Sequence, residues 1–284
     1  MEYSFSSDLK SIREILNLTQ SGLASEIGTE QATISRHESR QAMPSPELLE
    51  KAYAYAFRKG IRLNRLKEML WKEKLEKNHK LLFHGAKSQI NGPISIRAGR
   101  PGTDFGHGFY TGETYDQAAS FVSDFDRPSV YFLDFDLSNL NVLSYSVCQD
   151  WMITIAYYRG ALLEYKDHPI VRNCIDKVHG CDFIIAPIAD NRMFQIIDSF
   201  INGIITDVQC NHCLAATNLG MQYVMVSDKA ISNLRMIERC YVSDNEKQHY
   251  KSIRSSETKL GEDKVKLARI QFRGEGRYID QILT

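Results

Sequence analysis

The sequence predicts a multidomain protein in which a small all-α bundle is followed by a larger α+β domain. Its 284 residues, of which 43% are hydrophobic, can build one or two buried cores. Apolar residues recur at helical spacing near the start of the chain, whereas short apolar runs of strand length alternate with helical patterns later on. We expect a helical domain at residues 1–60, a basic connecting helix at 61–79, an α+β domain at 80–243 and a charged tail at 244–284.

The first domain is predicted to contain successive amphipathic helices. The first helix has an apolar stripe formed by Leu9, Ile12, Ile15 and Leu16. The second follows Thr19, which can cap it, and ends at Gly28. Thr29 is expected to cap a third helix that contains Ile34. This succession is a helix-turn-helix motif.

The spacing of residues through this motif resembles the phage-repressor family of DNA-binding proteins, also called Cro/cI or XRE. The resemblance is carried by Thr19, Gln20, Leu23, Ala24, Gly28, Ile34, Ser35, Glu38, Pro44, Pro46, Leu48 and Leu49. In that family the second helix of the motif places side chains on base edges in the major groove. The resemblance implies that the DNA-facing positions are Gln31, Ala32, Thr33, Ser35 and Arg36, with Gln20 and Arg40 on phosphates.

Gln31 and Arg36 are the side chains that we expect to recognise bases. An amide suits adenine and a guanidinium suits guanine, and each such pair discriminates by about 1–3 kcal/mol. Repressor-type proteins usually bind as two-fold dimers, so a homodimer is expected. The alternative is a bundle that serves only as a dimerisation module.

The segment that follows, residues 58–80, is rich in lysine and arginine and is predicted to form the connecting helix. Its apolar stripe is expected to consist of Leu63, Leu66, Leu70 and Trp71. This stripe should dock on one domain while the charges face solvent or DNA phosphate.

The second domain mixes strand and helix patterns, which favours α+β architecture. Buried strands are expected at residues 81–83, 130–133, 183–185 and 223–226. Capping-box spacing predicts helices that begin after Thr114 and Thr206, and an apolar stripe predicts a helix over residues 193–201. Cys210 and Cys213 supply one pair where structural zinc needs four ligands, so we expect core-facing thiols and no metal.

The most informative motif of this domain is a glycine- and aromatic-rich segment at residues 104–112, preceded by Phe83-His84-Gly85. Glycines let the backbone approach a ligand closely, and Tyr110 offers a flat face for a ring. The order of this motif, followed by Gln222-Tyr223-Val224, resembles the ADP-ribosyltransferase fold and, over residues 81–242, the bacterial DUF3990 group. Residues 182–191 are also similar to a stretch of that group.

The resemblance implies that NAD is the substrate and that its nicotinamide–ribose bond is cleaved through an oxocarbenium-like centre. His84 would bond a ribose hydroxyl and Gly85 the carboxamide, while Tyr110 stacks on the nicotinamide ring. The remaining pocket residues are expected to be Gly108, Phe109 and Tyr131. For His84, a core histidine at a strand end is the alternative.

Gln222 departs from the family pattern, because many members of the superfamily place a catalytic glutamate there. A neutral amide gives up attraction to a developing cation, so low turnover or a substitute carboxylate is expected. Asp190 is our preferred substitute, with Asp104 and Glu113 as alternatives. Arg192 and Arg100 are expected to bind the pyrophosphate, with Arg159 as a third candidate, although each alone also suits a surface ion pair.

The two resemblances together predict a cytoplasmic protein that joins a DNA-binding module to an NAD-dependent mono-ADP-ribosyltransferase. A toxin-antitoxin or defence effector fits this pairing, with the ADP-ribose acceptor and any antitoxin or regulatory partner left open. The alternative is a transcriptional regulator whose degenerate transferase domain senses NAD or ADP-ribose without catalysis. A third class is an interaction scaffold with no NAD affinity.

Two further expectations concern the membrane and the tail. No apolar run is long enough to cross a bilayer, and the scattered cysteines fit a reducing compartment. The composition of residues 244–262 predicts a linker, and the tail is expected to be partly disordered. For residues 278–283 a disordered terminus is the default expectation, and partner binding or folding back on the domain are the alternatives.

Overall fold

The computed structural model describes residues 2–99, 101–217 and 220–284. It divides into two compact units, each assembled from segments that are far apart in the sequence. We call them the N-terminal unit, made of Met1–Asn91, Thr114–Asp136 and Arg235–Arg254, and the central unit, made of Gly92–Glu113, Leu137–Leu234 and Ser255–Thr284. A helical N-terminal region is therefore followed by a mixed α/β region, whose strands belong to a seven-stranded sheet.

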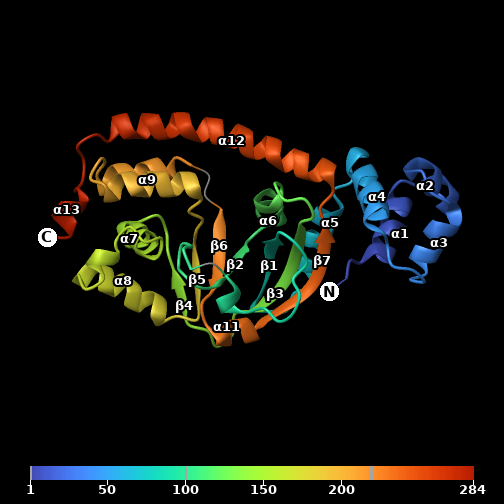
Figure 1. The fold of residues 1–284 in the computed structure, drawn as a ribbon, viewed down its shortest axis with the longest axis horizontal. Coiled ribbons are helices and arrows are strands. Elements are labelled where there is room, and N and C mark those ends of the chain that lie inside the picture. The colour runs from blue at the N-terminus through green and yellow to red at the C-terminus, as the bar shows by residue number, and fades with distance from the viewer. Residues whose placement is uncertain (1, 100, 218–219) are drawn as a thin grey trace. The chain divides into compact units, whose positions relative to one another are not determined.

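The N-terminal unit begins with the predicted helical bundle (blue in Figure 1). Its helices are α1 (Phe5–Ile15), α2 (Gln20–Ile27), α3 (Gln31–Glu38) and α4 (Pro46–Arg58). Leu9, Ile12, Leu23 and Ile34 are completely buried in its core. The caps of α2 are the predicted ones: Thr19 accepts a hydrogen bond from the Gly22 amide, and Gly28 adopts a left-handed conformation.

The predicted cap of α3 was wrong. Glu30, with extended backbone angles, precedes the helix, and its side chain makes no cap hydrogen bond. The Thr29 amide instead donates to the Ala24 carbonyl at 2.9 Å, so Thr29 belongs to the C-terminal cap of α2.

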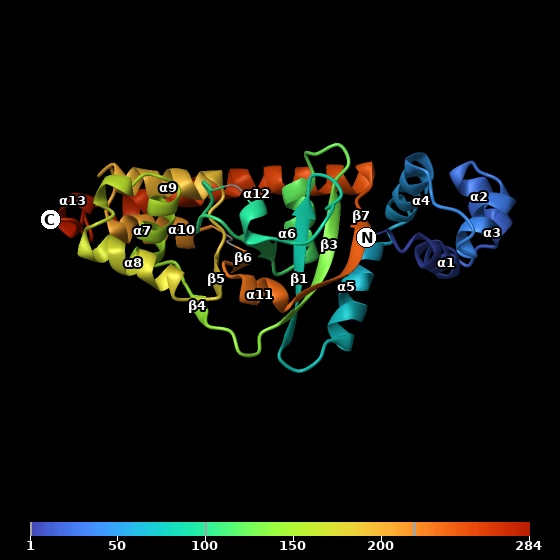
Figure 2. The same ribbon diagram turned by 60° about the horizontal axis from the view of Figure 1, so that its bottom comes forward.

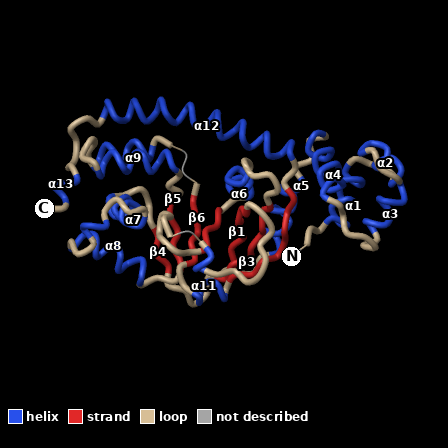
Figure 3. The backbone as a smooth tube through the Cα atoms, viewed as in Figure 1, coloured by secondary structure: helices blue, strands red, loops and turns tan. Residues whose placement is uncertain are grey.

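The same unit contains strands β1 (His79–Ala86), β3 (Ser129–Asp136) and β7 (Leu234–Tyr241), in the order β1-β3-β7. β1 and β3 are antiparallel and lie side by side (red in Figure 3). Helix α6 (Tyr115–Val122) packs on them and has the predicted capping box between Thr114 and Gln117. β7 was not predicted, because its Glu238 and Arg239 interrupt the apolar pattern, yet both are buried.

Helix α5 (Leu63–Lys74) forms as predicted, but only Leu63 and, in part, Trp71 of its predicted apolar stripe are buried. Leu66 and Leu70 are 40% and 55% exposed, respectively. The buried residues are Leu63, Asn64, Lys67 and Glu68. A lysine is stable there because its ammonium group lies 2.6 Å from the Asp8 carboxylate and 2.8 Å from the Glu238 carboxylate.

The central unit contains strands β4 (Val142–Ser144), β5 (Phe183–Pro187), β6 (Met221–Met225) and β2 (Phe109–Gly112), in that order. Its helices include α7 (Gln149–Tyr158), α8 (Pro169–His179), α9 (Asn191–Ile201), α10 (Asp207–Ala215) and α11 (Asp228–Ser232). Helix α7 packs on both α8 and α9, and α10 packs on α9 (Figure 2). Short 3-10 turns occupy Ile96–Ala98 and Leu163–Tyr165.

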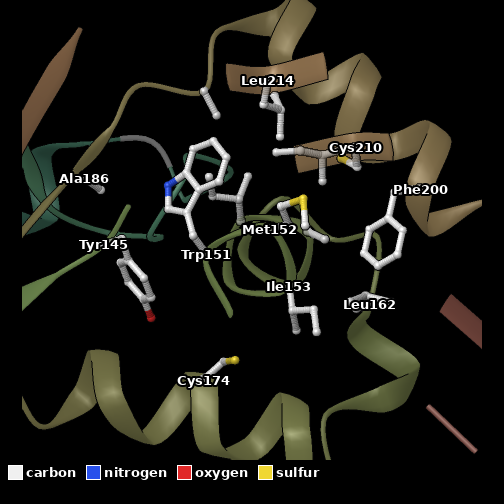
Figure 4. Close-up of a cluster of buried hydrophobic side chains, with 14 of the residues drawn as sticks. Tyr145, Trp151, Met152, Ile153, Leu162, Cys174, Ala186, Phe200, Cys210 and Leu214 are labelled. Atoms are coloured by element: carbon white, nitrogen blue, oxygen red, sulfur yellow. The ribbon is translucent and has the colours of Figure 1, made fainter. Parts of the chain in front are cut away.

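The core of the central unit surrounds Trp151 and Met152 of α7, with Phe200 of α9 and Cys210 of α10 nearby (Figure 4). Cys210 and Cys213 are both fully buried, as predicted for core-facing thiols. Burial raises the pKa of the Cys210 thiol well above its usual value, so this thiol is unreactive at neutral pH.

The tail differs from the expected linker. Residues Asp244–Gln271 form a long helix, α12, and Ile279–Ile282 form the short helix α13. Lysine, glutamate and arginine are good helix formers, which explains why a charged composition did not imply disorder. Tyr250 of α12 is buried in the N-terminal unit and donates to Asp116 at 2.5 Å. In the central unit, Ile279 and Ile282 join the core, so this segment folds back and the default expectation of a disordered terminus was wrong.

The described part of the chain contains no helix that is both long enough and apolar enough to span a membrane.

Candidate functional site

A buried carboxylate organises the centre of the central unit. Asp104 lies in the turn before β2 and is 5% exposed. Its Oδ1 accepts hydrogen bonds from Arg159 Nε at 2.9 Å and Nη2 at 2.5 Å. Its Oδ2 accepts from the Ala189 amide at 3.1 Å and from Gln222 Nε2 at 2.7 Å. The negative charge is thus paired with a guanidinium and is fully hydrogen-bonded.

The amide of Gln222, which is also 5% exposed, has a defined orientation. Its Nε2 donates to Asp104 Oδ2 and, at 3.1 Å, to the Pro187 carbonyl. Two acceptors in this position identify the nitrogen of the amide. Among the described residues no donor reaches Gln222 Oε1, and this atom is not one of the fully buried polar atoms without a partner.

Small residues flank Gln222 in the sheet. Gly112 of β2 and Ala186 of β5 are its direct cross-strand neighbours. Directly opposite residues on neighbouring strands share a face of the sheet, so both sides of the Gln222 side chain meet minimal bulk.

Tyr110 holds the turn that carries Asp104. Its hydroxyl lies 2.6 Å from Thr103 Oγ1, accepts from the Phe105 amide at 3.0 Å and donates to the Gly106 carbonyl at 3.0 Å. Burial raises the pKa of Tyr110 above its usual value, so the hydroxyl stays protonated at neutral pH. Stacking of Tyr110 on a nicotinamide ring stays a prediction, beside this structural role.

Two glycines of the motif lie where close packing leaves no room for a side chain. Gly106 has a φ of 73°, and a Cβ atom there would lie 2.9 Å from the Tyr158 ring. A Cβ on Gly108 would lie 2.9 Å from Val224 Cγ1 of β6. Phe109, the neighbour of Gly108, is buried. Glycine at both positions lets the turn and β2 pack closely.

His84, Gly85 and Tyr131 lie in the N-terminal unit. His84 of β1 is half-buried and stands opposite Tyr131 of β3. The Tyr131 hydroxyl accepts from the Ile90 amide at 2.8 Å. A Cβ on Gly85 would lie 2.7 Å from the Ala118 carbonyl, so glycine is needed for α6 to pack on β1.

The structure brings Asp104, and not our preferred Asp190, against Gln222. Asp190 is exposed and caps α9, accepting from the Arg192 and Met193 amides at 2.9 Å each. Its other oxygen lies 3.3 Å from Arg192 Nη2. Arg100 lies outside the described residues. Arg159, the third arginine candidate, is the ion-pair partner of Asp104, and its guanidinium also packs 4.6 Å from the Phe194 ring centroid.

The candidate DNA-binding surface lies on the bundle of the N-terminal unit. Gln31 Nε2 donates to Gln20 Oε1 at 2.8 Å, and Gln20 Nε2 donates to Glu38 Oε2 at 2.8 Å. Glu38 is buried and its Oε1 accepts from Arg13 Nε at 2.9 Å. This chain of hydrogen bonds orients the two glutamines before any DNA is bound.

The other predicted DNA-facing residues lie on α3, except Arg40, which follows the helix. Ala32, Arg36 and Arg40 are exposed, and Thr33 and Ser35 are half-buried. The Arg36 guanidinium rests on its own helix, donating to the Ala32 carbonyl at 3.3 Å. Arg40 has a φ of 59°, just beyond the C-terminus of α3.

Two protein-family models match this chain. A helix-turn-helix model matches residues 9–52. A model of DUF3990, described as a protein of unknown function, matches residues 81–236, which is more than half of the chain. The chain belongs to the DUF3990 family. No curated protein and no solved structure matches this DUF3990 protein. The helix-turn-helix match supports a DNA-binding regulator.

In this DUF3990 protein the helical bundle is bonded to the strands of its own unit. Besides the Lys67 ion pairs, Tyr241 of β7 donates to Glu50 of α4 at 2.9 Å. Asn64 of α5 donates to the Tyr115 hydroxyl at 2.7 Å, and that hydroxyl donates to Glu246 at 2.9 Å. The bundle and the β1-β3-β7 strands consequently share one folded unit.

Sequence reasoning missed the connection between Asp104, Arg159 and Gln222. These residues were named separately, as a candidate carboxylate, a third arginine and a catalytic position. Their separations of 55 and 118 residues along the chain leave no local signal of contact.

Proposed function

We propose that this DUF3990 protein is a nucleotide-responsive DNA-binding regulator. Its helix-turn-helix recognises an operator, and its DUF3990 domain binds NAD or ADP-ribose. The first half rests on the helix-turn-helix match and on the hydrogen bond between Gln20 of α2 and Gln31 of α3. The second half rests on the resemblance of the domain to ADP-ribosyltransferases.

The proposal that the domain senses the nucleotide and does not cleave it rests on the charges beside Gln222. The only carboxylate that the described contacts bring to this amide is Asp104, and its charge is paired with Arg159. A full negative charge 4 Å from an oxocarbenium ion contributes on the order of 4 kcal/mol at an effective dielectric of 20. A neutral ion pair contributes much less, because the guanidinium repels the same cation.

A second candidate is the ADP-ribosyltransferase effector of a toxin-antitoxin or defence system. It is favoured by the direct contact of Asp104 with Gln222, the position where many members of the superfamily that the domain resembles place a catalytic glutamate. In this case NAD is consumed and Asp104 supplies the attraction that Gln222 lacks, while the ion pair with Arg159 limits the rate.

The test measures binding and turnover with the same protein. Binding of NAD and ADP-ribose is measured by calorimetry, and release of nicotinamide is followed with cell extract as a source of acceptor. Saturable binding without nicotinamide release is the expected result. Nicotinamide release that His84→Ala abolishes would establish the transferase, and absence of nucleotide binding would overturn both candidates.

A further inference from the structure

We propose that a cavity in the N-terminal unit binds a small organic anion with a planar ring, and that this anion competes with DNA for Arg40. The cavity is lined by the start of the chain, the helical bundle and β7, all of which belong to that unit. Its volume of about 870 Å³ falls within the range of about 300–1,000 Å³ that small-molecule sites occupy. The Asp104 site belongs to the central unit, so the proposal does not depend on nucleotide binding by the DUF3990 domain.

Arginine side chains give the cavity an excess of positive charge. Arg40, Arg127 and Arg239 line it, and so do the carboxylates of Glu2 and Asp126. Asp126 lies 3.8 Å from Arg127, and both side chains are largely exposed, so solvent weakens this pair. A guanidinium offers parallel donors that match a carboxylate or a phosphate. The lining therefore favours an anion over a neutral or cationic ligand.

Arg40 has the side chain that we assign to the anionic group. It is exposed, and among the residues that the structure describes none forms a hydrogen bond or ion pair with its guanidinium. Its backbone has a φ of 59°, the left-handed conformation that glycine usually supplies after a helix. The Gln41 amide closes this cap by donating to the Arg36 carbonyl at 2.9 Å. An arginine at a position that suits glycine is explained when its side chain binds a ligand or DNA.

Arg239 supplies a fixed positive charge on the β7 side of the cavity. It is only 9% exposed. Its Nε donates to Ser129 Oγ at 3.0 Å, and its Nη1 donates to Gln89 Oε1 at 2.8 Å. The guanidinium carbon also lies 4.0 Å from the centroid of the Tyr3 ring. A charge that is held in this way attracts an anion into the cavity from a constant position.

Aromatic side chains form much of the apolar lining. Tyr3 and Tyr241 pack edge to face, with their ring centroids 5.6 Å apart. Phe5 packs in the same way against His37 at 5.5 Å. Aromatic rings attract further rings through offset or edge contacts. These walls therefore favour a ligand that carries a planar ring beside its anionic group.

The cavity reaches the DNA-binding motif at the C-terminus of α3. His37 of α3 and Arg40 both line it, and we expect Arg40 to contact DNA phosphate. A guanidinium that holds the anion of the ligand is withdrawn from the phosphate, and the charge of the ligand repels the DNA backbone. Bound ligand should therefore weaken DNA binding, and DNA should weaken ligand binding by the same factor. The ligand is thus an effector that releases the protein from DNA.

The probes are 2-naphthoate, 2-naphthyl phosphate and the neutral 2-naphthalenemethanol, which share one ring system and differ in their polar group. By calorimetry, wild type should bind at least one of the anions about tenfold more tightly than the alcohol. The two anions show whether a carboxylate or a phosphate is preferred. Arg40→Gln should remove most of this preference and leave the affinity for the alcohol unchanged. Arg58→Gln, the same change at an exposed arginine outside the lining, is the matched control.

Ser88→Trp tests the cavity without changing Arg40. Ser88 is exposed and lines the cavity shortly after β1, so an indole there should occupy the space of the ligand. Binding of all three probes should be lost, whereas a DNA duplex selected for tight binding should bind as to wild type. Saturating anion should weaken duplex binding about fivefold in wild type and leave it unchanged in Ser88→Trp. Ser146→Trp, at an exposed loop serine of the central unit, is the matched control.

Wild type that binds neither anion, or that binds all three probes alike, overturns the proposal. An anion preference that Arg40→Gln retains shows that Arg40 does not hold the anionic group. Anion binding that a folded Ser88→Trp leaves unchanged lies outside the cavity and overturns the site. If Ser88→Trp fails to fold, the loss of anion preference in Arg40→Gln decides the question. Anion binding with an unchanged affinity for the duplex contradicts the competition, and none of these results alters the proposed nucleotide binding.

Discussion

The helix-turn-helix of the N-terminal unit and the Asp104 site of the central unit use the same arrangement of side chains. In the first, Arg13 pairs with Glu38, and Glu38 holds the Gln20 amide at 2.8 Å. In the second, Arg159 pairs with Asp104, which holds the Gln222 amide at 2.7 Å. In both, a buried carboxylate that an arginine neutralises orients a glutamine.

The two sites differ in what the oriented amide faces. The oxygen of Gln20 already accepts from Gln31, so orientation passes to a second glutamine on the DNA-facing helix. The oxygen of Gln222 has no donor among the described residues. The same arrangement can thus fix the orientation of an amide at the surface of the helix-turn-helix and of a buried amide in the central unit.

The largest expected effect comes from Gln222→Glu, which places a second carboxylate against Asp104. Two carboxylates at this distance cannot both ionise, so one must take up a proton or the local structure must open. We expect a loss of about 4 kcal/mol in the free energy of unfolding at neutral pH, measured by urea denaturation. Adding Asp104→Asn should recover most of this loss; failure of the double variant to recover would contradict the arrangement.

A third buried carboxylate, Glu246, sharpens the comparison because no arginine hydrogen-bonds to it among the described residues. Its partners are Tyr115 and Asn64. Burial raises the pKa of Glu246 to about 7 from its usual 4.5. Its contribution to stability is therefore fully present below pH 4.5 and is lost as the pH rises through about 7.

Glu246→Gln tests this contrast. Between pH 5 and pH 8, wild type should lose on the order of 3 kcal/mol more in free energy of unfolding than the variant. Urea denaturation across this pH range measures the difference. If the free energies of unfolding of wild type and Glu246→Gln changed with pH in the same way, Glu246 would not differ from the carboxylates that an arginine neutralises.

A smaller effect is expected for Glu38→Gln, which removes the carboxylate of the helix-turn-helix arrangement. Loss of the charge-assisted bond with Arg13 should lower the free energy of unfolding by about 2 kcal/mol. Operator affinity, measured by fluorescence anisotropy, should fall as well, because Gln20 and Gln31 lose their orientation. Glu14→Gln, an exposed glutamate on α1, serves as the control. Unchanged operator affinity in a folded Glu38→Gln variant would show that the orientation is unimportant.

The smallest expected effect separates the two expected classes of DNA contact. Arg36→Ala should weaken binding mainly at sites that carry its guanine, by about 1–3 kcal/mol. Arg40→Ala should weaken all sequences similarly and reduce the salt dependence of binding. Anisotropy titrations on operator and scrambled duplexes at two salt concentrations measure both; identical behaviour of the two variants would remove the distinction.

The two sites also differ in how far the sequence predicts them. The helix-turn-helix is local: Thr19, Gly28 and the apolar residues of α1 to α3 act within a few turns, so spacing alone predicts the motif. The bonds to Asp104 span 55, 85 and 118 residues, and only folding of the central unit joins them. The buried Lys67 was unpredictable for the same reason, since its partners Asp8 and Glu238 come from opposite ends of the unit.

Strands were predicted where apolar runs were long and missed where they were short or charged. β2 and β4 contain only four and three residues, respectively. β2 also begins within the glycine-rich motif, where the sequence predicted a ligand site but no strand. The strand positions of His84 and Gln222 followed from their apolar neighbours, whereas the contacts of each side chain did not.

The measurement that tests the account most directly is operator affinity as a function of ADP-ribose and NAD concentration, with Gln222→Met as the matched variant. We expect nucleotide to change the affinity of wild type at least fivefold, with a much smaller change for Gln222→Met, because binding at one site must alter the other reciprocally when they are coupled. Saturable nucleotide binding with an unchanged operator affinity would contradict the proposal of a nucleotide-responsive regulator.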